Sequence, residues 1–486
     1  MPEDSVPGDN VPGDSGPGEG VVVRQRPKIG LLGIMQELYD DMIPGITDHQ
    51  ASFAKELVAA LSGTADIVFL RPARTREDVE AVTKELNEAG VDGIMIVMLT
   101  YGPAMRTVRA LLENPLPVLL ANVQPEREVT DRWDMADLTY NQGIHGAQDQ
   151  ANALLRSGVP FSVITDDWQS DSFRRSVGSW ARAAMAVSAL KRAKIALFGY
   201  PMNGMGDVLY EAPSLMRRIG PVVVNENLGE LFSKMQEVSE GEIKSLMALH
   251  HERFSVSADL PSESHAYAAR MELGLRSMLE AGGYSGFAIH FEPVGKDGRF
   301  NQLPLLAASD LMADGYGYGA EGDTNSAALL CASQSLIGNA HFSEMYAMDF
   351  ELGSVLISHM GEGNWKVARR DRPIRLVDRE LGIGGLGNPP TAVFSAQPGR
   401  ATTASLVPLE GEAYRLVVGT GEVLDTPELS KVEMPYFHFH PDGDVKSFMN
   451  SWLHNGGTHH FCTNLGDHVA RWQYLAELLD IDFVEI

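Results

Sequence analysis

The chain has 486 residues, which exceeds the size of one ordinary hydrophobic core and predicts two to four domains. Its formal net charge of −26 disfavours nucleic-acid binding and anionic membranes, because an acidic surface repels both. It has no uncharged run of 18 or more apolar residues, and its two cysteines are too few for a disulfide framework. We therefore expect a cytoplasmic protein without a signal peptide that handles a neutral or cationic small molecule.

Residues 1–26 are rich in Gly, Pro, Asp and Ser and carry little apolar surface. This composition predicts a disordered tail. Residues 27–193 then alternate between short apolar runs and amphipathic segments, which predicts a doubly wound parallel sheet of the flavodoxin or Rossmann-like kind. The expected strands cover residues 28–35, 65–70, 91–99 and 116–123. The expected helices cover residues 46–62, 75–90, about 104–113 and about 170–192.

Residues 194–338 repeat this alternation and predict a second doubly wound α/β domain. The expected strands cover residues 194–200, 221–226 and 286–292, and the expected helices cover about 303–314 and 323–337. Residues 339–486 instead contain short strands separated by Gly and Pro, such as DFELGSVLISHM, TAVFSA and YRLVVGTGEVL. This texture is typical of a β-barrel or sandwich, and we expect a C-terminal β-barrel domain finished by helices at 444–454 and 466–479.

The loops after the predicted parallel strands are where ligands bind in such sheets. They include GIMQELY (33–39), MLTYGPA (98–104) and FGYPMNG (198–204). None matches the glycine-rich dinucleotide motif or the Walker A motif, so a nucleotide site is not supported.

Four short segments carry residues that can bind a metal ion. They are YGAEGD with Glu321, HFSEMY with Glu344, ISHM with His359, and NGGTHH with His459 and His460. Each has a plain structural alternative: a carboxylate at a helix N-terminus, a core histidine, or solvated imidazoles in a surface turn. Together, two carboxylates and two imidazoles suit a borderline divalent ion such as Mn²⁺, Co²⁺ or Fe²⁺.

An ordered set of motifs runs through the chain from about residue 28 to the C-terminus. In order, they are MQELY (35–39), TYGPA (100–104), NQGIHG (141–146), FGYPM (198–202), GYGYGAEGD (315–323), SHM (358–360), LGIGG (381–385) and GGTHH (456–460). This set resembles the L-arabinose isomerase family, within the wider arabinose/fucose isomerase group.

The resemblance implies a metal-dependent aldose–ketose isomerase. The implied metal is most often Mn²⁺, with Co²⁺, Fe²⁺ or Mg²⁺ as alternatives. Position by position, the implied metal ligands are Glu321, Glu344, His359 and His460, and the two glutamates are the implied catalytic acid and base. The implied sugar-binding residues are Gln36, Tyr101, Gln142, His145, Met202, Phe291, Ile383 and His459.

The implied reaction moves a proton between C1 and C2 of a sugar through a cis-enediol. The cation would stabilise charge on the sugar oxygens, and the two glutamates would remove and return the proton. The family further implies a homo-oligomer, trimer-based or hexameric, in which a neighbouring subunit completes the pocket through its NQGIHG loop.

This chain also departs from the family pattern. Met345 stands where the family has Asp, Asp349 where it has His, and Leu386 where it has Lys. These changes leave the ligand set intact but make the identity of the sugar an open question. A related metal-dependent epimerase and a non-catalytic sugar-binding homologue are the alternatives. His438 and His440, on one face of a possible strand, suggest packing or solvated histidines more than a second metal site.

Overall fold

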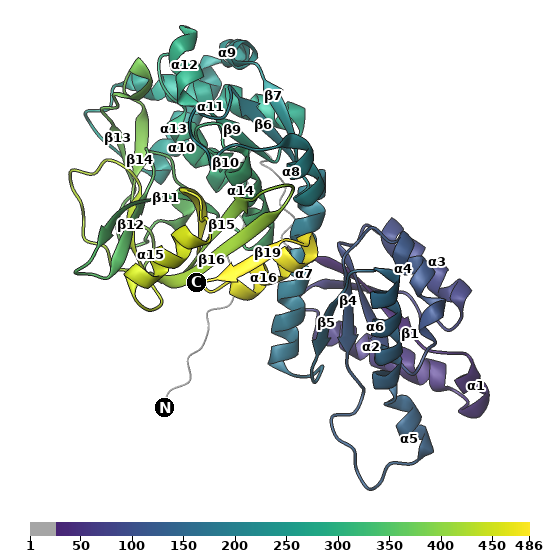
Figure 1. Ribbon diagram of the computed structural model, residues 1–486. Coiled ribbons are helices and arrows are strands. Elements are labelled where there is room, and N and C mark those ends of the chain that lie inside the picture. Colours follow the sequence, from purple (N-terminus) through teal and green to yellow (C-terminus); the bar gives the residue numbers. More distant parts are fainter. Residues whose placement is uncertain (1–25) are drawn as a thin grey trace.

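The computed structural model describes residues 26–486, which form two lobes (Figure 1). The smaller lobe holds the N-terminal part of the chain, and the larger lobe holds the central and C-terminal parts. The tail predicted over residues 1–26 lies outside the described residues, apart from Arg26. Within the described part, no helix is long and apolar enough to cross a membrane.

The smaller lobe is built on a five-stranded parallel sheet with the order β2-β1-β3-β4-β5, which confirms the first predicted parallel sheet. Every residue of its central strand β3 is buried, as expected when helices cover both faces. The strands are β1 (Lys28–Ile34), β2 (Asp66–Phe69), β3 (Gly93–Met98), β4 (Val118–Asn122) and β5 (Ser162–Thr165). The helices are α1 (Leu38–Met42), α2 (Ile46–Ala60), α3 (Arg76–Glu88), the 3-10 turn η1 (Ala104–Arg106), α4 (Val108–Glu113), α5 (Met135–Tyr140), α6 (Gly143–Ser157) and α7 (Asp171–Arg192).

Local signals in the sequence place the helix ends. Thr75 caps α3 by accepting a hydrogen bond from the Asp78 amide, and the Asp78 carboxylate accepts one from the Thr75 amide. This reciprocal pair satisfies two backbone donors that a helix start leaves free. Ser170 caps α7 with a single hydrogen bond, which its hydroxyl oxygen accepts from the amide of Phe173.

Helix α7 lies between the two lobes and packs into both of their cores (Figure 1). Its Trp180 and Ala184 join the core of the smaller lobe, whereas Val187 and Leu190 join that of the larger lobe. Because one helix serves both cores, the domain boundary predicted at residue 193 stays a prediction.

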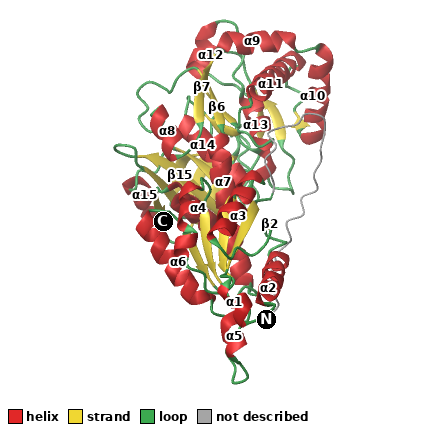
Figure 2. Ribbon diagram, turned by 90° about the vertical axis from the view of Figure 1, so that its right-hand side faces the viewer, coloured by secondary structure: helices red, strands yellow, loops and turns green. Residues whose placement is uncertain are grey.

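The larger lobe contains a second parallel sheet with the order β10-β9-β6-β7, which confirms the second predicted α/β layer. Its strands are β6 (Lys194–Phe198), β7 (Val222–Glu226), β9 (Gly286–Ile289) and β10 (Gly317–Gly319). The helices around it are α8 (Ala212–Arg218), α9 (Leu228–Glu237), α10 (Glu240–Arg253), α11 (Ser262–Gly282), α12 (Phe291–Asp297), α13 (Leu305–Ala313) and α14 (Thr324–Leu336). Helices α9 to α12 lie at the end of the molecule opposite α1 and α5 (Figure 2).

The strand predicted over residues 286–292 is shorter than expected. Strand β9 ends at Ile289, and helix α12 begins at Phe291. His290 is the extended residue before the helix, and Pro293 falls in the first turn, where a missing amide donor costs nothing. The apolar run GFAIHFE therefore ends in a helix, in which Phe291 is half-buried against the core of the larger lobe.

The C-terminal part contains an antiparallel-rich sheet with the order β15-β18-β11-β12-β17-β16-β19, in which β15 also pairs with β16. Its strands are β11 (His341–Asp349), β12 (Ser354–Ser358), β15 (Gly399–Pro408), β16 (Tyr414–Val423), β17 (Tyr436–Pro441), β18 (His460–Leu465) and β19 (Asp482–Glu485). Beside it lie a small sheet and further helical segments: β8 (Ser255–Val256), β13 (Arg375–Asp378), β14 (Pro390–Val393), η2 (Trp365–Val367), η3 (Ile383–Gly385), α15 (Val445–His454) and α16 (Val469–Leu479). A C-terminal sheet rich in antiparallel strands is thus confirmed, and both a closed barrel and a separate domain over residues 339–486 stay predictions.

The segment DFELGSVLISHM does not form a single strand. The Asp349 carboxylate accepts hydrogen bonds from the amides of Glu351 and Leu352, and this closes a turn between β11 and β12. Gly353 follows with a φ of 61°, which a glycine adopts without strain. The strand predicted there begins only at Ser354.

Candidate active site

Three neighbouring strands bring a glutamate and two histidines together. Glu344 on β11 pairs with His460 at the start of β18 and, on its other side, with Ser358 at the end of β12. His359 follows Ser358 directly. Residues opposite each other in an antiparallel pair point to the same face, so Glu344 and His460 lie on one side of the sheet. The register of β11 shifts just after Glu344, a bulge of the kind that re-aims side chains beside functional sites.

Glu321 comes from a different sheet, in the loop between β10 and α14 at the carboxyl edge of the parallel strands. Its φ of 49° is left-handed, which is uncommon for a residue with a side chain. At Gly322, a Cβ would lie 2.4 Å from the Tyr200 carbonyl oxygen, so only glycine allows this close approach. The Met202 amide donates to the Glu321 carbonyl at 2.9 Å. The loop after β6 therefore holds the Glu321 backbone in place.

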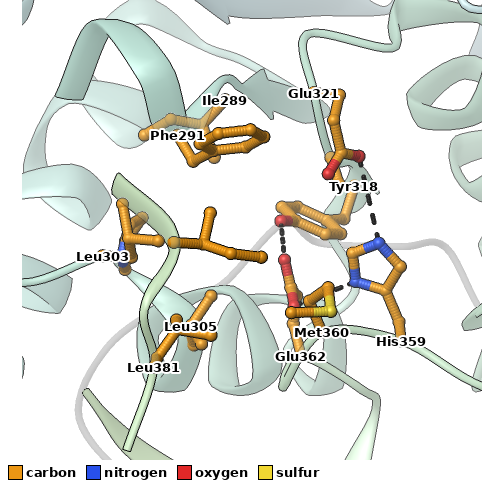
Figure 3. Close-up of a pocket in the computed structure, with 13 residues that line it drawn as sticks. Ile289, Phe291, Leu303, Leu305, Tyr318, Glu321, His359, Met360, Glu362 and Leu381 are labelled. Carbon is orange, nitrogen blue, oxygen red and sulfur yellow. Dashed lines mark hydrogen bonds and ion pairs between the residues drawn. The ribbon is translucent and has the colours of Figure 1, made fainter. Parts of the chain in front are cut away.

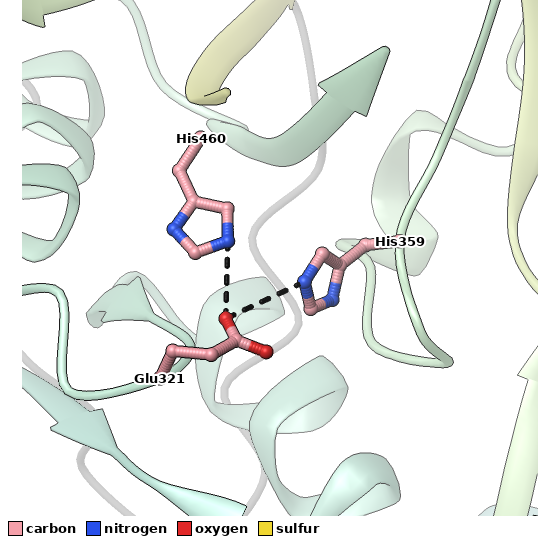
Figure 4. Close-up of side chains that lie close together, drawn as sticks. All are labelled: Glu321, His359 and His460. Atoms are coloured by element: carbon pink, nitrogen blue, oxygen red, sulfur yellow. Dashed lines mark ion pairs between the residues drawn. The ribbon is translucent and has the colours of Figure 1, made fainter. Parts of the chain in front are cut away.

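Three of the four predicted ligands, Glu321, His359 and His460, converge, and the fourth, Glu344, approaches His359. The Nε2 atom of His460 lies 3.0 Å from Oε2 of Glu321, and Nε2 of His359 lies 3.9 Å from the same oxygen (Figure 4). Nε2 of His359 is also 4.0 Å from Oε2 of Glu344. Ligand atoms of Glu321, His359 and His460 all lie within 4.8 Å of one another, a spacing that a single metal ion can bridge.

A carboxylate orients each of the two imidazoles through its other ring nitrogen. His359 Nδ1 lies 3.0 Å from Oε2 of Glu362 (Figure 3). His460 Nδ1 lies 3.0 Å from Oδ2 of Asp323. The Tyr318 hydroxyl donates to the other oxygen of Glu362. With Nδ1 of each ring held by its carboxylate, Nε2 is the nitrogen that faces Glu321 and that would bind a metal ion. Metal-binding histidines are oriented in this way.

The site favours positive charge at its centre. Burial lowers the pKa of His460, but hydrogen bonds and charges from Asp323 and Glu321 outweigh this effect and raise it to about 10. The pKa of His359 is likewise raised against the effect of burial, by Glu362. Burial raises the pKa of Glu362, but His359 lowers it to about 2. The surrounding carboxylates of Glu321, Asp323 and Glu362 therefore stabilise either protons on the imidazoles or a metal cation between them.

The surroundings of the ligands are apolar and closed on one side. The ring of Phe342, two residues before Glu344 on β11, lies 4.8 Å from the rings of both His359 and His460. Phe342 is fully buried, and His359 and His460 are almost so. Both imidazoles therefore pack against the Phe342 ring, which shields that side of them from water.

The glycines of NGGTHH perform the turn expected of them. Gly456 ends α15 with a φ of 79°, and at Gly457 a Cβ would lie 2.4 Å from the Trp452 indole nitrogen. The chain can thus reverse tightly against Trp452 and enter β18 at His460, whose side chain points into the ligand set.

Four predicted sugar-binding residues lie near the ligands. Phe291 and Ile383 line one pocket together with Glu321 and His359 (Figure 3). His459 lines a second pocket, which contains Glu321, Glu344, His359 and His460. Met202 contacts the site through its backbone bond to Glu321.

The other four predicted sugar-binding residues lie in the smaller lobe, away from the ligand set (Figure 1). Gln36 and Tyr101 follow the carboxyl ends of β1 and β3, and Gln142 and His145 lie at the start of α6. The rings of Tyr101 and His145 stack with centroids 4.9 Å apart. The Gln142 side-chain nitrogen is buried without a hydrogen-bond partner among the described residues. One chain therefore carries two separate groups of the predicted site residues.

Two residues beside the site were missed by the sequence reasoning. Glu362 follows His359 at a spacing of three, a local signal that could have suggested a partner for the imidazole. Asp207 bonds to His459 from a loop 252 positions earlier in the chain, and no local pattern pointed to it. His438, considered for a second metal site, is instead buried with its Nδ1 2.9 Å from the Ser354 hydroxyl.

Comparison with known proteins covers nearly the whole chain. The chain matches, in order, the family models of three L-arabinose isomerase domains. These are the N-terminal domain over residues 25–192, the central domain over 213–339 and the C-terminal domain over 339–482. The chain belongs to the L-arabinose isomerase family. The resemblance carried by the eight motifs is thereby confirmed.

Individual relatives agree with this assignment. L-arabinose isomerase from Aeromonas hydrophila subsp. hydrophila is 30% identical over 91% of this chain and 90% of the relative. L-arabinose isomerase from Nocardioides sp. (strain JS614) is 31% identical over 92% of this chain and 91% of the relative. Membership of this L-arabinose isomerase family makes the chain an enzyme, an aldose–ketose isomerase.

One solved structure that the chain matches is only weakly similar to it. A periplasmic solute-binding protein from Actinobacillus succinogenes 130z with bound D-allose is 13% identical, with a TM-score of 0.18 over 64% of this chain and 92% of that chain. A TM-score this low carries no argument about fold or ligand.

Proposed function

We propose that this L-arabinose isomerase family member is a metal-dependent enzyme that interconverts an aldose and a ketose through a cis-enediol. The observation that carries the proposal is the orientation of the two imidazoles. His359 and His460 each give Nδ1 to a buried carboxylate and direct Nε2 toward Glu321. The two rings thus turn their second nitrogens toward one shared carboxylate, and this convergence is the arrangement that a bound metal ion needs.

The donor set fits a divalent cation of borderline character, with Mn²⁺ as the first choice and Co²⁺, Fe²⁺ or Mg²⁺ as alternatives. The ligands would be the carboxylates of Glu321 and Glu344 and the Nε2 atoms of His359 and His460. When bound, the cation would supply Lewis-acid stabilisation of negative charge on the sugar oxygens.

The chain's own residues would move the proton between the two carbons. Glu321 and Glu344 line the same pocket, with the Nε2 atom of His359 3.9 Å from the first carboxylate and 4.0 Å from the second. One glutamate would take the proton from C2 of the aldose, and the other would give a proton to C1. The proton of the C2 hydroxyl would pass to the C1 oxygen, so that no atom is gained or lost overall. Phe342 and the apolar lining around Phe291 and Ile383 would limit access of water to the enediol.

The substrate is proposed to be L-arabinose or a sugar closely related to it, by analogy with the named relatives. The three departures from the family pattern bear unequally on this choice. Met345 lines the pocket that holds the ligands, whereas Asp349 closes a turn and Leu386 packs against the core. Met345 is therefore the departure expected to change which sugar fits.

We further propose that the active enzyme is a homo-oligomer, trimer-based or hexameric. The support is the division of the predicted sugar-binding residues between two lobes of one chain. Within one chain, the smaller lobe places Tyr101, Gln142 and His145 away from Glu321 and Glu344. In the oligomer, these three residues would complete the pocket of a neighbouring subunit.

The test is a sugar screen on protein stripped with EDTA and then supplied with Mn²⁺, with aldose–ketose conversion as the readout. We expect turnover that returns with the metal and is lost in Glu321→Gln, a variant of the same size that cannot take up a proton as a carboxylate does. Turnover that persists in the EDTA-stripped protein would contradict the proposed dependence of the reaction on a metal ion. Conversion of an aldose to its epimer, without ketose, would favour an epimerase. Sugar binding without any turnover would favour a non-catalytic binding protein.

A further inference from the structure

The loop that follows β6 is fixed at both ends to the segment that carries Glu321. The Met202 amide donates to the Glu321 carbonyl at 2.9 Å, and the Asn325 side chain donates to the Leu209 carbonyl at 3.1 Å. Asp207 lies between these two anchors. Its position relative to the ligand set is therefore set by the same backbone that positions Glu321.

Asp207 makes two contacts with one residue of the GGTHH segment. Its Oδ2 atom accepts a hydrogen bond from the backbone amide of His459 at 3.0 Å and lies 2.6 Å from His459 Nδ1. The ring of His459 also packs against the ring of His460, with centroids 3.9 Å apart and the ring planes tilted by 38°. The imidazole of His459 is thus held by a carboxylate on one edge and by a ligand histidine on one face.

The second ring nitrogen of His459 is left without a protein partner. Its Nε2 atom is buried and makes no hydrogen bond with the described residues. The pocket that His459 lines contains both glutamates, and its other walls include Met205, Met345 and Met360. Thioether sulfurs do not donate hydrogen bonds, and the hydroxyl of Tyr346, which also lines this pocket, is hydrogen-bonded to Glu344. A buried polar atom without a partner is costly unless a ligand supplies one.

We infer that Asp207 is a positioning residue that fixes the ring of His459 with Nε2 directed at a hydroxyl group of the sugar. This inference rests on the proposed function and deepens it. Asp207 binds Nδ1, so Nε2 is the ring nitrogen left for the substrate, and a sugar hydroxyl can both donate and accept a hydrogen bond. His459 would touch the substrate, and Asp207 would act only through His459.

The test compares KM and kcat for L-arabinose with Mn²⁺ in the wild type and in Asp207→Ala. Loss of the fixed orientation is expected to raise KM about tenfold, the cost of one weakened hydrogen bond, with a smaller effect on kcat. Asp207→Asn keeps an acceptor oxygen at the same place and should retain most of the affinity. Asn203→Ala, an exposed change in the same loop, is the matched control and should leave KM unchanged.

A second set of variants separates this role from a merely structural one. His459→Gln can place its side-chain oxygen near the position of Nε2 without help from Asp207. Adding Asp207→Ala to His459→Gln should therefore raise KM no further, whereas a structural role would make the two effects add. Mn²⁺ affinity and the thermal midpoint should be unchanged in Asp207→Ala. An unchanged KM in Asp207→Ala, or additive effects in the double variant, would overturn the inference.

Failure of the proposed function would look different. If the wild type turns over no sugar, the proposed reaction falls, and the inference is then tested by equilibrium binding of L-arabitol to the Mn²⁺-loaded protein. Binding about tenfold weaker in Asp207→Ala than in the wild type would uphold the inference. Equal binding by the two proteins would overturn it.

Discussion

Single carboxylates decide which nitrogen each ligand histidine offers. Glu362 holds His359 through Nδ1 and is itself held by the Tyr318 hydroxyl, so three side chains form a chain of hydrogen bonds behind one ligand. All three are buried, which strengthens each bond and raises the cost of removing one member.

Removal of Glu362 should therefore weaken metal binding without removing a ligand. In Glu362→Ala, His359 loses the partner that fixes its orientation, and we expect Mn²⁺ affinity to fall about 10- to 100-fold. Tyr318→Phe is the graded control: it keeps the Glu362–His359 bond and should lose less affinity. Calorimetric titration with Mn²⁺ measures both. Equal affinity in Glu362→Ala and the wild type would show that the carboxylate does not act through the ligand.

At the scale of elements, much of the fold was predictable and the site assembly was not. The bounds of β1, α3 and α7 follow from local apolar patterns and caps such as Thr75, and the structure confirms them within about two residues. The pairing of Glu344 with His460 depends on which distant strands meet and in which register. No local pattern contains that information, and only the family resemblance brought those residues together in advance.

A second buried cluster ties three helices of the larger lobe together. On α10, His250 lies with Nδ1 2.8 Å from His265 of α11 and Nε2 2.9 Å from Asp310 of α13. Nε2 is also 3.7 Å from Glu272. Both ring nitrogens of His250 thus face groups that can accept a hydrogen bond. This arrangement stabilises the protonated, positively charged imidazolium. Burial lowers the pKa of His250, but Asp310 and Glu272 outweigh it and raise it to about 9.

The free energy of unfolding should therefore decrease as the pH becomes alkaline. A histidine with a raised pKa in the folded state contributes stability that is complete below its unfolded pKa of about 6.5 and is lost as pH rises through about 9. The contribution is about 3 kcal/mol. Thermal unfolding followed from pH 6.5 to 10 should show the midpoint falling across this window.

The variant His250→Leu isolates this effect. It leaves Asp310 and Glu272 without their shared cationic partner, although Arg253 at 3.8 Å from Asp310 and Arg276 at 2.9 Å from Glu272 remain. We expect a loss of about 3–5 kcal/mol at neutral pH and a flatter dependence on alkaline pH. His454→Leu, an exposed change at the end of α15, is the matched control. A pH dependence that survives unchanged in His250→Leu would place its origin elsewhere.

At the scale of the whole molecule, the predicted sugar-binding residues fall into two groups. Glu321, Glu344 and His459 belong to the larger lobe, whereas Tyr101 and His145 stack in the smaller lobe. The sequence alone could not reveal this division, because the relative placement of two lobes depends on packing around α7. A pocket completed by a second copy reconciles the two groups.

Subunit mixing tests this arrangement. Glu321→Gln and His145→Ala should each be inactive or nearly so as pure proteins, because each spoils one half of every pocket. Unfolded, mixed and refolded together, they should regain part of the activity, since some pockets then combine an intact Glu321 with an intact His145. Activity no greater than that of the separate variants would contradict a pocket shared between subunits. Refolded wild type gives the yield against which recovery is judged.

The central claim is that Glu321 and Glu344 move a carbon-bound proton at a metal site. The most direct measurement is isomerisation in D₂O with Mn²⁺, followed by NMR of the carbon-bound positions of substrate and product. We predict deuterium at C1 of the ketose and at C2 of the recovered aldose in the wild type, and none at either position in Glu321→Gln or in EDTA-stripped protein. Ketose formed at the wild-type rate by Glu321→Gln, or deuterium incorporated without metal, would contradict this account.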